Sequence, residues 1–127
     1  MRYIVSASLV IVGLIHLLPV GGVLGVERLA TLYGVSIGDP STEILMRHRA
    51  VLFAMLGAVM LAAAFIPAWQ PLALLAGGAS VLSFLVLAWL VPGYSVQVAR
   101  VVVADAVALV LLLLGGAAWV LSRPLAR

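Results

Sequence analysis

Four long apolar stretches, separated by short segments with proline, glycine and charged residues, dominate the hydrophobic pattern of the chain. They cover about residues 3–20, 44–66, 72–91 and 98–121. At about 1.5 Å of rise per residue, an α-helix of these lengths matches a hydrocarbon core about 30 Å thick. Backbone amides in lipid must find partners within their own segment, so we expect each stretch to be a transmembrane helix.

The segment between the first two stretches has a different pattern. Residues 25–33, GVERLATLY, place apolar side chains on one helical face and polar side chains on the other. This pattern predicts a short amphipathic helix in the membrane interface. Gly34 can end that helix in a left-handed conformation, and Asp39-Pro40 suits the N-cap and first turn of the second span.

These elements predict an all-α fold. The chain is expected to be a polytopic membrane protein, a four-helix transmembrane bundle with a short interfacial amphipathic helix between spans one and two. A single transmembrane domain covers residues 1–127, without an internal repeat. We expect the first span to be retained rather than cleaved as a signal peptide, because three further spans follow and no A-x-A site ends it.

Composition supports lipid as the surrounding solvent, since 66% of the 127 residues are hydrophobic and only 9% are charged. The absence of cysteine excludes disulfides, thiolate catalysis and cysteine-ligated metal sites. The net charge of +3 comes without a long basic tract, so we expect no nucleic-acid partner. Nucleotide-binding and zinc-protease motifs are also missing from the sequence, and we predict no metal site.

The arginines are divided almost evenly between the two membrane faces that this threading defines. The side of the termini has Arg2, Arg123 and Arg127, and the opposite side has Arg28, Arg47, Arg49 and Arg100. If a polar site holds the second group, the positive-inside rule places the termini in the cytoplasm. We expect an integral protein of a bacterial inner (plasma) membrane in that orientation.

Threading four antiparallel spans brings the polar residues of the spans to one end of the bundle. The end of span one, the start of span two, the end of span three and the start of span four share that end. The candidate ligand-binding residues there are His16, Arg47, His48, Arg49, Tyr94, Gln97, Arg100 and Asp105. Ionisable groups within a membrane are costly and generally functional, so we predict a polar pocket near this face.

Asp105 is the deepest acid, and Arg49 is the partner that we expect for it. Gln97 shares a helical face with Asp105, whereas Arg100 lies off that face. The pair of Arg49 and Asp105 is either part of a site or a structural ion pair that fixes helix register.

The other basic residues also have structural interpretations. Arg47 can bind lipid headgroups or pair with Glu43, and His48 can simply lie in the interface. His16 can serve as a hydrogen-bonded interior histidine. Together His16 and His48 also resemble the axial ligands of a b-type haem, but two arginines flank His48 and we do not expect haem.

Small residues recur at helical spacing in the last three spans and permit close helix approach. We expect most of them to pack within the chain, and a homodimer through these faces is the alternative.

The stretch RHRAVLFAMLG, residues 47–57, has arginines at the head of the second helix and small residues behind them. In this stretch and in its topology the chain resembles the small four-span DoxX-like membrane proteins. Some of that group are thought to work beside quinones or in redox-linked membrane complexes. The resemblance therefore implies a lipophilic small molecule as the ligand.

Three functional hypotheses follow from this pattern. The first is a membrane protein that binds a quinone-like or lipid-like molecule in the polar pocket, in a role that is redox-linked if the ligand is redox active. The second is a structural or accessory membrane subunit without catalysis. The third is a small proton-coupled transporter, which the lack of repeats and broken helices disfavours.

Overall fold

The computed structural model describes residues 1–123, and these residues contain helices and connecting turns. The elements in chain order are α1 (Arg2–Leu17), the 3₁₀ segment η1 (Leu18–Leu24), α2 (Val26–Tyr33), α3 (Pro40–Phe65), the 3₁₀ turn η2 (Pro67–Trp69), α4 (Gln70–Leu90) and α5 (Val96–Leu121). Four of the helical segments in this part of the chain are long and apolar enough to cross a membrane. The predicted all-α transmembrane bundle is therefore confirmed.

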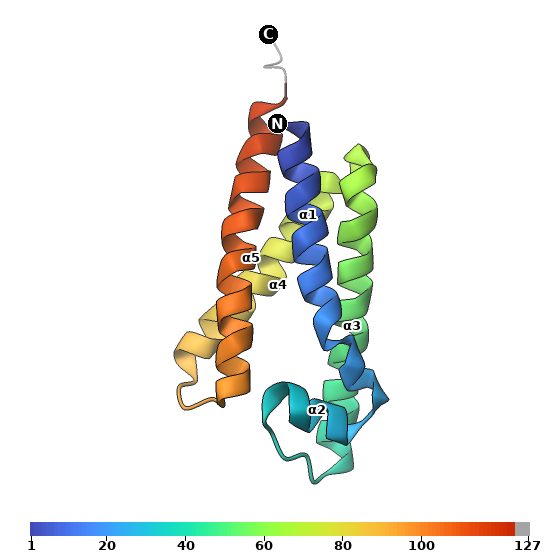
Figure 1. Ribbon diagram of the computed structural model, residues 1–127, viewed down its shortest axis with the longest axis vertical. Coiled ribbons are helices and arrows are strands. Elements are labelled where there is room, and N and C mark those ends of the chain that lie inside the picture. The colour runs from blue at the N-terminus through green and yellow to red at the C-terminus, as the bar shows by residue number, and fades with distance from the viewer. Residues whose placement is uncertain (124–127) are drawn as a thin grey trace.

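Both ends of the described chain lie at one end of the bundle, and α2 lies across the opposite end (Figure 1). Helices α1, α3 and α5 run along the long axis, while α4 crosses behind them in this view. The buried core is apolar and includes Leu9, Val12, Met60, Val81 and Leu112. This threading places the start of α3 and of α5 at the same end as α2.

The predicted first span differs from the structure at its end. The expected helix over 3–20 stops at Leu17, and the chain continues as 3₁₀ helix through Leu24. The proline ring at Pro19 is incompatible with the α-helical hydrogen bond and carbonyl packing one turn earlier, which explains the change of helix type. The chain then turns at Gly25, where φ is 135°, a backbone conformation that residues other than glycine rarely adopt.

Local capping chemistry sets the starts of α3 and α5. The carboxylate of Asp39 accepts a hydrogen bond from the amide of Thr42 at 3.0 Å, and this bond lowers the pKa of the Asp39 carboxyl. The hydroxyl oxygen of Ser95 likewise accepts from the amide of Val98 at 3.2 Å. Helix α3 thus begins at Pro40, before the apolar stretch at 44, and α5 begins at Val96, before the expected position 98.

Helix α2 packs against protein as well as having the expected amphipathic pattern. Leu29 is fully buried, and Tyr33 is 6% exposed. The side chain of Leu29 fills the space beside Gly22, where a Cβ atom would lie 2.7 Å from it. Gly34 ends α2 with a φ of 63°, the left-handed conformation predicted from sequence.

A pair of glycines lets helices α1 and α3 approach closely. A Cβ atom on Gly57 would lie 2.9 Å from the carbonyl oxygen of Gly13 and 3.0 Å from the side chain of Leu17. A Cβ atom on Gly116, in contrast, would have no neighbour within 4 Å among the described residues. Gly57 therefore serves packing within the chain, as the small-residue pattern predicts for most such positions.

This contrast predicts opposite effects for two identical substitutions. In G57A the gain of about 1 kcal/mol in helix propensity is smaller than the overpacking cost, so we expect a net loss of about 1 kcal/mol of stability. In G116A the propensity gain stands alone, and stability should rise by about 0.5–1 kcal/mol. Unfolding of both variants in mixed detergent micelles measures the difference. Equal effects would show that α1 and α3 are not in contact at this position.

Candidate functional site

A cavity of about 310 Å³ lies at the α2 end of the bundle, between α1, α2, α3 and α5. Its apolar wall is formed by Ile15, Leu18, Pro19, Leu32, Phe53, Val101 and Ala104. Its polar wall has His16, Thr31, Tyr33, Arg49, Gln97, Arg100 and Asp105. A volume of this size is at the lower end of the range for small-molecule sites, and an apolar wall with a few convergent polar groups is typical of them.

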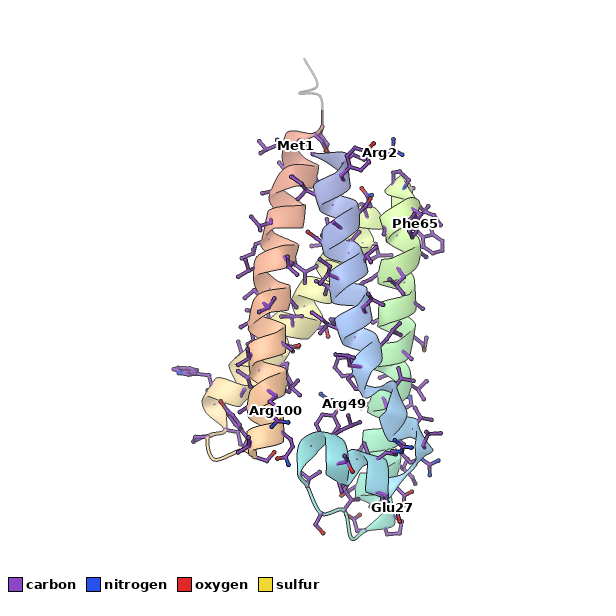
Figure 2. The ribbon with its side chains drawn as sticks, viewed as in Figure 1. Met1, Arg2, Glu27, Arg49, Phe65 and Arg100 are labelled. Carbon is purple, nitrogen blue, oxygen red and sulfur yellow. The ribbon has the colours of Figure 1, made fainter. Side chains whose placement is uncertain are left out.

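Two arginines from different helices lie at this end of the bundle. Arg49 comes from α3 and Arg100 from the first turns of α5, and Figure 2 shows them at a similar height along the long axis. Arg49 is half-buried, and Arg100 is exposed at the rim. The cavity therefore has one cationic group in its wall and a second at its edge.

Aromatic rings and a phenol hold the guanidinium of Arg49. Its Nη1 donates a hydrogen bond to the hydroxyl of Tyr33 at 2.8 Å. The guanidinium carbon lies 4.6 Å from the ring centroid of Phe53, 5.1 Å from that of Tyr33 and 5.9 Å from that of Phe84. Because these rings come from α2, α3 and α4, Arg49 joins three elements through cation–π contacts.

His16 is buried, and its hydrogen bonds fix the ring in the cavity wall. Its Nδ1 lies 2.9 Å from the carbonyl oxygen of Val12, and its Nε2 lies 3.3 Å from the hydroxyl of Ser80 on α4. A carbonyl only accepts, so Nδ1 has the hydrogen, and in a neutral ring Nε2 accepts from Ser80. The ring also packs on Phe53, with 5.5 Å between centroids. The interpretation of His16 as a hydrogen-bonded interior histidine is thus confirmed, and the residue still borders the cavity.

Asp105 is the unusual residue of the site. It is 7% exposed, lies in the cavity wall, and its carboxylate has no hydrogen-bond or salt-bridge partner within residues 1–123. The expected ion pair with Arg49 does not form within salt-bridge distance, and the guanidinium instead bonds to Tyr33 and packs on Phe53. Every fully enclosed side-chain nitrogen or oxygen in this part of the chain has a hydrogen-bond partner. The carboxylate oxygens of Asp105 have none, so they are not fully enclosed and reach the cavity space.

The remaining candidates lie at the cavity edge or outside it. The side chain of Gln97 lies in the wall and packs against the backbone at Gly34. Arg47, His48 and Tyr94 are exposed and do not line the cavity. Because His48 is exposed and does not line the cavity that His16 borders, the structure does not bring the two imidazoles together at this site.

Arg47 is held by partners outside the cavity. It makes an ion pair with Glu43 at 3.0 Å, as its spacing predicts, and donates a hydrogen bond to the carbonyl of Val23 at 2.9 Å. Three consecutive residues on α3 thus have different surroundings, and Arg49 alone among them borders the cavity.

Tyr33 and Phe53 are parts of the site that the sequence did not identify. The apolar face of α2 already contained Tyr33, but nothing in the pattern indicated that this face would pack back on α3. Ser95 adds a second link, because its hydroxyl donates to the carbonyl oxygen of Tyr33. A tyrosine at the end of an amphipathic helix, followed by glycine, was the available signal for a helix that folds back.

Within residues 1–123 no three histidine, aspartate or glutamate side chains gather as a metal site would require. Comparisons with known protein families, with characterised proteins and with solved structures found no match to this chain. The cavity is a partly apolar chamber with two guanidiniums and one unpaired carboxylate at one end of a membrane bundle.

Proposed function

We propose that this integral membrane protein binds a lipophilic small molecule, quinone-like or lipid-like, in the cavity at the α2 end of the bundle. The polar head of the ligand lies among Arg49, Arg100, Gln97 and Asp105, and its apolar part lies against the aliphatic wall and Phe53. The observation that carries this proposal is the unpaired carboxylate of Asp105, buried in the wall of a cavity of ligand size.

Leaving Asp105 without a partner is energetically costly. A carboxylate in the membrane is unfavourable by about 2.5–3.5 kcal/mol at the bilayer centre, and pairing usually offsets this cost. Arg49 donates its hydrogen bond to Tyr33 and forms no salt bridge with Asp105. A bound head that donates to Asp105 supplies the missing partner, which is the reason to retain an acid at this position.

The structural-subunit hypothesis rested on an ion pair between Arg49 and Asp105 that does not form. Its remaining support is the well-satisfied His16, which links α1 to α4 through Ser80. A redox role rests on the DoxX-like resemblance and stays a prediction, and the bacterial inner membrane also stays a prediction. On the side opposite the termini, Arg47 and Arg49 are held by contacts within the protein. The arginines beside the termini then decide the orientation under the positive-inside rule, which supports cytoplasmic termini.

Filling the cavity tests the proposal directly. Ala104 borders the cavity, whereas Ala106, two residues along α5, is exposed on the outer surface. We expect a lipophilic compound to be found by mass spectrometry after extraction from gently solubilised wild-type protein and from A106F. The same compound should be depleted at least about tenfold from A104F, because the phenyl ring occupies its space. Equal amounts from A104F and A106F would place the compound outside the cavity and overturn the proposal.

A further inference from the structure

We infer that the ligand is a single-chain amphiphile with one acidic group and a hydroxyl group on the tail side of that acid. β-Hydroxy fatty acids and lysophospholipids share this chemistry. The inference rests on the proposed function and narrows it to a ligand class.

The first step is the surplus of positive charge and hydrogen-bond donors in the cavity. A guanidinium has five N–H donors, and the described residues accept one hydrogen bond from Arg49 and none from Arg100. Asp105 is the only acid among the cavity residues and contacts neither arginine as an ion pair. A carboxylate or phosphate with several acceptor oxygens satisfies this surplus, and guanidinium is the side chain best shaped to bind either.

The second step is the order of these groups along the membrane normal. Asp105 lies five residues beyond Arg100 on α5, a rise of about 7.5 Å toward the bundle centre. Arg49 is at a height similar to that of Arg100 (Figure 2). The acid of the ligand therefore meets the arginines nearer the membrane face, and the group that meets Asp105 lies deeper, toward the tail.

The third step is the chemistry of that deeper group. The carboxylate of Asp105 accepts hydrogen bonds and has no donor among the described residues, so its partner must be a donor. In a two-chain phospholipid the atoms on the tail side of the phosphate are ester groups, which only accept. In a lysophospholipid or a β-hydroxy acid the same position has a free hydroxyl.

The space available also favours one chain. The cavity is about 310 Å³, and the buried core around Val12 and Leu112 continues beyond it toward the membrane centre. The cavity thus accommodates a head with the first methylenes of one chain, and the rest of that chain leaves between helices into lipid.

Binding to the purified full-length protein in detergent micelles tests the inference with two pairs of probes. One pair is β-hydroxymyristate and myristate, and the other is oleoyl lysophosphatidate and its analogue without the free hydroxyl. In at least one pair we expect the hydroxylated member to bind about tenfold or more tightly, since hydrogen bonds to charged groups have this magnitude. The pair that shows the larger preference identifies the source of the acid group.

A matched pair of variants assigns the preference to Asp105. In D105A the hydroxylated and plain probes should bind equally, while E27Q, which changes an exposed acid outside the cavity, should keep the wild-type preference. If wild-type protein binds both members of each pair equally, the hydroxyl inference is wrong and the proposed function stands. If none of the probes binds at a site that A104F blocks, while A104F still depletes a co-purifying compound, the acid inference is wrong. If A104F depletes nothing, the proposed function itself fails.

Discussion

Replacement of Arg49 by glutamine should weaken the binding of an anionic amphiphile by about 10- to 100-fold, because hydrogen bonds to charged groups contribute about 1.5–3 kcal/mol. Glutamine keeps a donor near the hydroxyl of Tyr33 but removes the positive charge that faces the cavity. Titration with the fluorescent carboxylate cis-parinarate, added to the purified protein in neutral detergent micelles, measures the change in affinity directly.

Arg47 provides the matched control for this measurement. It lies on the same helix, has the same charge, and pairs with Glu43 outside the cavity. The variant R47Q should keep an affinity within about twofold of wild type, since exposed ion pairs and charges contribute little. If R47Q and R49Q weaken binding equally, general attraction between basic residues and the probe explains the effect, and Arg49 is not part of a site.

Two boundaries, the start of α3 and the end of α2, could be predicted because local chemistry determines them. The Asp39-Pro40 pair starts α3 through a side-chain cap, and Gly34 ends α2 in the left-handed conformation. Both depend on a few neighbouring residues, which a sequence shows completely. The 3₁₀ segment after Leu17 was missed because Pro19 indicates only that a regular helix stops, and not how the chain continues.

The gathering of polar groups at one end could also be predicted, because antiparallel threading fixes which helix ends meet. What threading leaves open is the rotation of each helix about its axis. Arg47, His48 and Arg49 are consecutive and project about 100° apart on α3, so the three cannot all face one cavity. The contacts of Phe53 and Tyr33 with Arg49 show which one does, and these contacts are tertiary.

The partner of Asp105 was predicted wrongly for a related reason. Charge complementarity favours Arg49, but cation–π contacts and a phenol compete for the same guanidinium, and these partners come from α2 and α4 as well as α3. Helix α2 is held at this position by tertiary contacts, with Leu29 docked beside Gly22 and Ser95 bonded to the carbonyl of Tyr33. A sequence pattern gives the amphipathic face of α2 but not the surface that it packs against.

The unpaired state of Asp105 leads to a prediction that separates a binding site from a structural role. Because the carboxylate is buried without a partner in residues 1–123, D105N should raise the free energy of unfolding, by about 1–2 kcal/mol in ligand-free protein. Asparagine has a similar shape and helix propensity, so the change isolates the charge. The control D39N should leave stability nearly unchanged, because asparagine also caps helices. Unfolding by increasing amounts of dodecyl sulfate in mixed micelles measures both variants.

A loss of stability in D105N would show that the carboxylate holds the helices together, as the structural-subunit hypothesis requires. A gain would mean that the protein retains a destabilising acid for binding, a common relation between stability and function.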